Sequence, residues 1–100
     1  QNGGVIKVTP IQIEEVKQAI KGKAIKSYIG HPGTAMVLSK LLGVPVQTSR
    51  EMFSFDSQNN FLIVFAMLSR LPEGRELGED EIQELYNKGQ LKFYSVNLLR

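Results

Sequence analysis

The stretch FLIVFAML (residues 61–68) decides the fold of this chain of 100 residues. Every residue in it is apolar, so a strand with this sequence would bury both of its faces. The stretch is also too short to cross a bilayer as a helix, which needs about 20 apolar residues. We therefore expect it to form the central strand of a sheet.

The chain after this strand predicts a loop, a helix and a last strand. The loop is SRLPEGREL (69–77). The segment GEDEIQELYNKG (78–89) predicts a helix, because acidic residues occupy its first turn and Lys88 and Gly89 end it. The segment QLKFYSVNLL (90–99) predicts a strand.

The chain before the central strand begins with a strand and a helix. A short strand is predicted from Val5 to Val8. Thr9 would then be the N-cap of a helix, with Pro10 as its first residue and Gln12 completing a capping box.

Three further elements are predicted between this helix and the central strand. The segment KAIKSYI (23–29) alternates between two faces, which is typical of a strand. The segment GHPGTAMVLSKLLG (30–43) predicts a helix with apolar residues at helical spacing and a glycine at its end. A strand from about Arg50 to Phe55 then leads into DSQNN (56–60), a hairpin turn.

The predicted order of elements is therefore β-α-β-α-β-β-α-β. It combines crossover connections with one hairpin, which favours a mixed sheet covered by helices. We predict a single α/β domain over residues 1–100, with a mixed sheet of about five strands and three helices.

The composition argues against several classes of function. The net charge is only +2, so we expect neither a general membrane surface nor a duplex nucleic acid as partner. The chain has no cysteine and one histidine, which argues against a zinc site within one subunit, and no metal or cofactor is expected. The absence of cysteine and of a signal-peptide pattern favours the cytoplasm.

The one histidine lies in YIGHPGT (28–34), directly before the second predicted helix. Its imidazole can donate or accept a proton near neutral pH. Free backbone N–H groups at a helix start attract anions, and glycine lets a ligand approach the backbone. Gly30, Gly33 and Thr34 would thus form a phosphate cradle beside His31. The alternative is that His31 only caps the helix.

Further polar residues follow the predicted central strand, where ligand crevices of α/β sheets tend to open. Arg70 offers a planar fork for a phosphate, and Glu73 could orient a hydroxyl or hold the proton of the histidine. Arg50 precedes another predicted strand. Taken singly, each of these residues is typical of a solvated surface charge.

Taken together, a histidine, a phosphate cradle, two arginines and a glutamate suggest metal-free cleavage of an RNA phosphodiester. RNA supplies its own nucleophile, the 2′-hydroxyl, and its attack leaves a 2′,3′-cyclic phosphate. The protein then needs only to align this group, stabilise the phosphorane and protonate the leaving 5′-oxygen.

Four motifs in order resemble those of the viral anti-CRISPR ring nucleases, whose relatives occur in archaeal viruses, phages and bacterial type III CRISPR loci. The first is Ile-Gly-His-x-[Ser/Gly]-Thr at a helix start, and an arginine follows nineteen positions after the histidine, here Arg50. An Arg-Leu-x-Glu-Gly loop spans residues 70–74, and Leu-Tyr-x-x-Gly spans residues 85–89. The resemblance covers the chain from Ser27 onward.

This resemblance implies a homodimer that binds cyclic tetraadenylate in a pocket across its two-fold axis. The family cuts this ring into linear diadenylates without a metal and thereby switches off type III CRISPR signalling. His31 would be the general acid, Glu73 would assist catalysis, and Arg70 would hold phosphate. The remaining ligand contacts would come from Gly30, Gly33, Thr34, Arg50 and Ser69.

The chain departs from the family pattern in two places. Family members open with a strand and an Asn-containing loop that lines the pocket; the strand would lie before Gln1, and Asn2 would be what remains of the loop. The family often has a polar residue four positions before the loop arginine, where this chain has Ala66. Asn2 is kept as a predicted ligand contact from that loop, whereas no ligand contact is predicted from Ala66.

Two other functions stay open from the sequence. A protein that only binds or sequesters a cyclic oligonucleotide would need the arginines and the cradle but not His31. A small dimeric regulator that binds DNA or RNA is the second, and the low net charge without a basic stripe argues against it. Viral and cellular origin remain equally compatible with the sequence.

Overall fold

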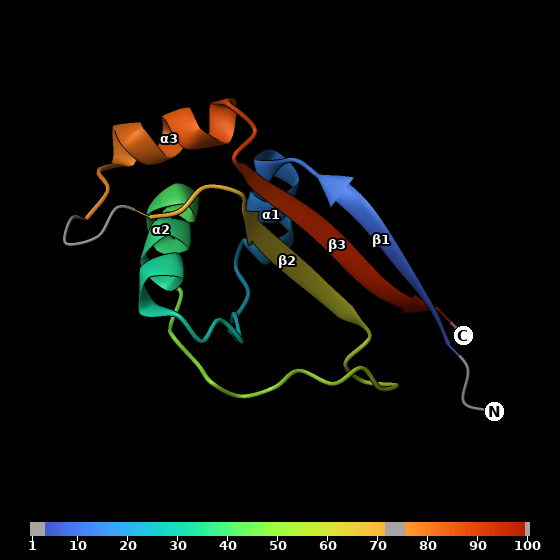
Figure 1. The fold of residues 1–100 in the computed structure, drawn as a ribbon. Helices are drawn as coiled ribbons and strands as arrows, with labels where there is room; N and C mark the ends of the chain where they lie inside the picture. The colour runs from blue at the N-terminus through green and yellow to red at the C-terminus, as the bar shows by residue number, and fades with distance from the viewer. Residues whose placement is uncertain (1–3, 72–75, 100) are drawn as a thin grey trace.

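The structure is a computed structural model that describes residues 4–71 and 76–99. The prediction of a small α/β domain with three helices is confirmed (Figure 1). Its elements are β1 (Val5–Ile11), α1 (Ile13–Ile20), α2 (Pro32–Leu42), β2 (Phe61–Met67), α3 (Glu79–Asn87) and β3 (Leu91–Leu99). No helix among the described residues is long and apolar enough to span a membrane.

The described sheet has three strands in the order β1-β3-β2, and all neighbours are antiparallel. Val96 of β3 pairs with Val8 on one side and with Leu62 on the other. The prediction of about five strands in a mixed sheet was therefore wrong in number and in direction.

The central strand is β3, and the predicted central strand is β2 at an edge. The two assignments differ because an apolar run reports what covers the two faces of a strand. It does not report how many neighbours the strand bonds to. In β2, all residues from Leu62 to Met67 are partly exposed.

The segments 23–29 and 50–55 lie beside one another without forming strands. The Ser49 N–H donates to the Ile29 carbonyl at 2.8 Å, and the rings of Tyr28 and Phe53 are 5.2 Å apart. This backbone hydrogen bond joins Ile29 to the residue directly before the segment 50–55. Alternation of side chains predicted strands here, but a strand also needs a bonded neighbour along its length.

The turn predicted at 56–60 is present, although no strand precedes it. The Asp56 N–H donates to the Asn59 carbonyl at 3.0 Å, and the Asp56 carboxylate accepts the N–H groups of Gln58 and Asn59 at 2.7 Å each. These short-range hydrogen bonds close the turn without help from a hairpin.

The first helix starts later than its capping signals predicted. β1 runs through Pro10 to Ile11, and Gln12 is the N-cap of α1, where its N–H donates to Glu15 Oε1 at 3.2 Å. Proline fits β1 because β1 is an edge strand, and a residue whose nitrogen faces solvent there does not need to donate a hydrogen bond to the sheet. Thr9 is therefore a strand residue.

The helices bury one face of the sheet at one end. The fully buried side chains are Val16, Ile82, Leu91 and Phe93, and the Phe65 and Phe93 rings lie 5.2 Å apart. The opposite end, where β1 begins and β3 ends in Figure 1, extends beyond the helices. Its strands leave these large apolar side chains exposed: Val5, Ile6, Val8, Phe61 and Leu99.

Candidate functional site

A cavity of about 670 Å³ lies between α2, the chain that follows β2 and the chain that leads into α3. It brings together residues that are far apart in the sequence. Of the predicted site residues, His31, Gly33, Thr34, Ser69 and Arg70 line it. Its floor is apolar and includes Met67, Leu77 and Ile82.

His31 is the N-cap residue of α2, with an extended backbone at φ −109° and ψ 119°. Its carbonyl accepts the Ala35 N–H at 3.1 Å, but its side chain makes no capping hydrogen bond. The imidazole is exposed at the cavity, so the interpretation of His31 as a side-chain cap has no support. Pro32 has no N–H, and no described residue accepts the N–H groups of Gly33 and Thr34.

Gly33 is required by the close approach of two side chains. A Cβ added at this position would lie 3.1 Å from Leu71 Cδ1 and 3.2 Å from His31 Cε1. Both distances are shorter than ordinary van der Waals contact. The absence of a side chain at Gly33 therefore lets His31 and the chain next to Arg70 come together over the helix start.

Gly30 and Arg50 lie beside this turn without lining the cavity. A Cβ on Gly30 would be 3.7 Å from the Ser49 carbonyl oxygen and 4.0 Å from Arg50 Cγ. The backbone hydrogen bond between Ser49 and Ile29 holds the two segments in this arrangement. Arg50 thus lies next to the residue that precedes His31, although its predicted strand is absent.

The chain that carries Ser69 and Arg70 is held by Gln90, a residue that the sequence reasoning missed. The Leu68 N–H donates to the Gln90 carbonyl at 2.8 Å, and the Ser69 hydroxyl pairs with Gln90 Oε1 at 2.7 Å. Ser69 therefore serves here as an anchor. Arg70 is exposed at the cavity and forms no ion pair with the described residues.

Lys40 is a second cavity residue that the sequence reasoning missed. Its ammonium group lies 2.6 Å from Glu76 Oε1 and donates to the Leu77 carbonyl at 2.7 Å. The spacing of Gly33, Val37 and Lys40 places them on one face of α2, and this helical period was the signal that could have identified Lys40.

Two predicted site residues, Asn2 and Glu73, lie outside the described residues. Within residues 4–71 and 76–99, no group of three or more His, Cys, Asp or Glu side chains could hold a metal ion.

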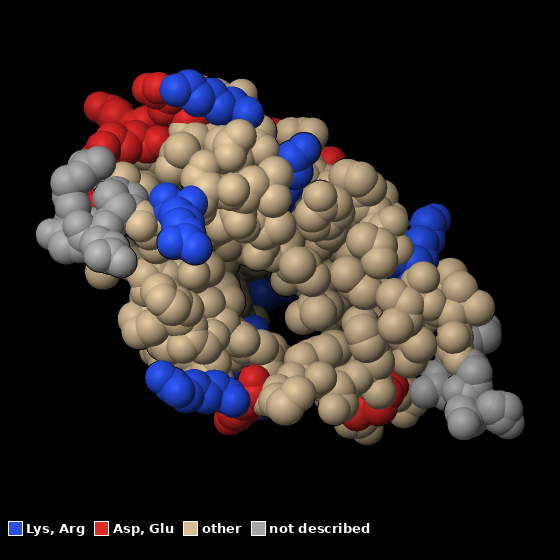
Figure 2. All heavy atoms as spheres, in the orientation of Figure 1, with Lys and Arg blue, Asp and Glu red and all other residues tan. Residues whose placement is uncertain are grey.

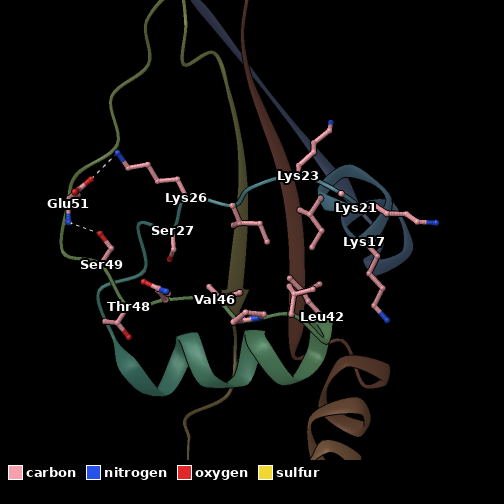
Figure 3. A pocket seen from close by; sticks show the side chains of 16 residues that line it. Lys17, Lys21, Lys23, Lys26, Ser27, Leu42, Val46, Thr48, Ser49 and Glu51 are labelled. Carbon is pink, nitrogen blue, oxygen red and sulfur yellow. Dashed lines mark hydrogen bonds and ion pairs between the residues drawn. The ribbon is translucent and has the colours of Figure 1, made fainter.

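A second cavity, of about 930 Å³, carries more positive charge than the first. Four lysines line it, namely Lys17, Lys21, Lys23 and Lys26. Figure 3 shows the first three pointing outward from the end of α1, whereas Lys26 reaches toward Glu51. The Lys26 Nζ atom lies 3.2 Å from Glu51 Oε2, and this hydrogen-bonded ion pair raises the pKa of Lys26.

The face seen in Figure 2 is hollowed at its centre, and mostly uncharged atoms surround the hollow. Acidic side chains gather over α3, whose first turn contains Glu79, Asp80 and Glu81. The Lys and Arg side chains visible on this face are spread apart, whereas four lysines line the larger cavity.

Comparison with known proteins places these features in one family. The STIV B116-like family model matches residues 1–94. The chain is 33% identical over 98 residues to the uncharacterized protein YddF of Bacillus subtilis (strain 168), covering 96% of this chain and 86% of YddF. Its fold is similar to that of B116 of Sulfolobus turreted icosahedral virus, with a TM-score of 0.81, 24% identity, and coverage of 96% and 85% of the two chains.

Proposed function

This chain belongs to the STIV B116-like family, and we propose that it is a metal-independent ring nuclease. Its substrate would be cyclic tetraadenylate. The products would be linear diadenylates with 2′,3′-cyclic phosphate ends, and their formation would switch off type III CRISPR signalling.

The observation that carries the proposal is the juxtaposition of His31 and Arg70 in one cavity. The two residues are 39 positions apart in the sequence, yet both line the same 670 Å³ space together with the open N-terminus of α2. A proton donor, a guanidinium and two unpaired backbone N–H groups are the parts that phosphodiester cleavage by an internal 2′-hydroxyl requires.

In this proposal each group has one task. The N–H groups of Gly33 and Thr34 bind a phosphate oxygen at the positive end of the α2 dipole. Arg70 forms a charge-assisted hydrogen bond with the same phosphate or its neighbour. His31 protonates the leaving 5′-oxygen, and the proton of the attacking 2′-hydroxyl leaves to water. Glu73 would assist, as the resemblance to ring nucleases implies.

We also propose that the active species is a homodimer. A symmetric ring with four phosphates suits an isologous two-fold interface, and a dimer supplies each arginine twice. The exposed apolar side chains at the uncovered end of the sheet provide surface that a second copy could bury. Light scattering that shows only monomer, with and without the ring, would argue against the shared pocket.

The deciding experiment incubates the protein with labelled cyclic tri-, tetra- and hexaadenylate in EDTA and separates the products by chromatography. We expect the tetramer to be cut to diadenylates with cyclic phosphate ends. Tight binding without product would instead support the non-catalytic binding protein. Neither binding nor cleavage of any ring would overturn the proposal.

A second candidate function gains support from the larger cavity. Lys17, Lys21 and Lys23 form no ion pair with the described residues, so their charges are available to a polyanion. This grouping favours the nucleic-acid-binding regulator more than the net charge alone did. Its test is the affinity for a DNA duplex at rising salt: a steep loss of affinity would support it, and the Lys21→Gln, Lys23→Gln variant should then bind more weakly with a shallower salt slope.

A further inference from the structure

We propose that Lys40 is a positioning residue that sets the width of the cavity between His31 and Arg70. The inference rests on the proposed function for the identity of the ligand, and on the described contacts for the geometry. Lys40 lies in the last turn of α2 and reaches across to the chain before α3.

The chain that carries Arg70 is tied at two places. Gln90 holds Leu68 and Ser69, directly before Arg70, and Lys40 holds Glu76 and Leu77, which line the same cavity as Arg70. The first tie joins this chain to the beginning of β3. The second joins it to α2, the helix that begins at His31. Lys40 is therefore the polar link between the two walls that present the proposed acid and the proposed phosphate ligand.

The contacts of Lys40 differ from those of the other lysines that form ion pairs. The Lys40 side chain is 26% exposed, whereas the side chains of Lys26 and Lys88 are 68% and 64% exposed. Lys40 also donates to a main-chain carbonyl, that of the buried Leu77. Exposed pairs contribute little because solvent screens them, but a half-buried ammonium with two acceptors holds a fixed geometry.

The test compares Lys40→Met with Lys88→Met. Methionine keeps much of the aliphatic volume and removes both hydrogen bonds. Lys88 provides a matched control because its pair with Glu84 is exposed and neither residue lines the cavity. Hydrogen exchange read by mass spectrometry should be at least about tenfold faster around Leu77 in Lys40→Met, because each lost hydrogen bond to a charged group accounts for a factor of about ten or more. Lys88→Met should exchange there like the wild type.

A second readout separates positioning from general stability. The affinity of Lys40→Met for cyclic tetraadenylate should fall about tenfold, and Lys40→Arg should recover most of it. The double variant Lys40→Met, Arg70→Ala should bind no more weakly than Arg70→Ala alone, because Lys40 acts through the placement of Arg70. Additive losses would mean a purely structural role and would overturn the inference.

The two proposals can fail separately. If the wild type binds no ring, the proposed function fails, and the exchange comparison still decides whether Lys40 fixes the cavity wall. If the ring is bound and cut normally by Lys40→Met, with exchange around Leu77 unchanged, the inference fails and the proposed function stands.

Discussion

The imidazole of His31 lies over Gly33, so that a Cβ on Gly33 would come within 3.2 Å of His31 Cε1 and 3.3 Å of Nδ1. The two residues are neighbours across the first peptide units of α2, where Pro32 fixes the backbone. The position of the ring therefore depends on the absence of a side chain at Gly33, which connects the glycine of the motif directly to its histidine.

Substituting Gly33 with alanine should affect ring cleavage without lowering the stability of the fold. Alanine favours a helix over glycine by up to about 1 kcal/mol, so the melting temperature should stay level or rise. The added methyl must displace His31 or Leu71 by a few tenths of an ångström, and we expect ring cleavage to slow by about tenfold or more.

The matched control is Gly78→Ala, because Gly78 is also at a helix start and a Cβ there would meet only Glu81 Oε1 at 3.7 Å. Cleavage by this control should be unchanged. Equal cleavage by Gly33→Ala and the wild type would show that the close packing of the two residues has no role in the reaction.

Of the helices, α2 and α3 were predicted most closely from the sequence, whereas α1 starts later than its capping signals predicted. Local signals define them: Pro32 at the start of α2, Gly43 in the left-handed region at φ 74° after its end, and acidic residues in the first turn of α3. The strands were predicted less well, because pairing is decided by residues distant in the sequence. The alternation in 23–29 was compatible with a strand, but in the structure this segment lies beside its neighbour without the row of backbone hydrogen bonds that defines a strand pair.

The part of the site that is formed by residues close together in the sequence was predictable. The part that is formed by tertiary contacts between distant residues was not. YIGHPGT (28–34) contains the histidine, the glycine and the helix start that lie together in the structure. The helical period places Lys40 on the face of α2 that lines the cavity, but it does not predict the partner Glu76, which is 36 residues away. No local pattern predicts that Gln90 binds Ser69, 21 residues away.

Replacing Arg70 with alanine should weaken ring binding as well as turnover. The guanidinium lines the cavity and has no ion partner among the described residues, so its donors are available to a phosphate. Loss of one hydrogen bond to a charged group costs about 1.5–3 kcal/mol. Calorimetry should record this loss of binding free energy for Arg70→Ala, and the control Lys88→Ala should bind the ring as the wild type does. If Arg70→Ala binds as tightly as the wild type, Arg70 is a solvated surface charge without a role in binding.

The Lys26–Glu51 pair predicts a pH effect at the larger cavity. The hydrogen bond that the Lys26 ammonium donates to the Glu51 carboxylate raises the pKa of Lys26 above its ordinary 10.5. A raised pKa in the folded state means that the pair stabilises the fold below pH 10.5, and that this contribution is lost as the pH rises through the pKa of the folded state. Titration by NMR should show a lower pKa for Lys26 in Glu51→Gln than in the wild type, and a lower pKa in the wild type at 1 M salt than at low salt. An unchanged pKa in Glu51→Gln would mean that the pair does not form in solution.

Replacing His31 with alanine should preserve binding and slow cleavage. The groups proposed to hold phosphate, the Gly33 and Thr34 N–H groups and Arg70, do not depend on the imidazole for hydrogen bonds. The side chain makes no capping contact, so its loss should leave the melting temperature nearly unchanged. Removing a general acid lowers the rate by about 10²–10⁴-fold, and single-turnover assays in EDTA should record a loss in this range.

The same assay distinguishes the two interpretations of YIGHPGT. Ring affinity measured by calorimetry should agree between His31→Ala and the wild type, because an acid that acts on the leaving oxygen contributes in the transition state and little in the ground state. If His31→Ala cuts the ring at the wild-type rate, the imidazole has no catalytic role. His31 would then act only through its backbone carbonyl, which accepts the Ala35 N–H at the start of α2.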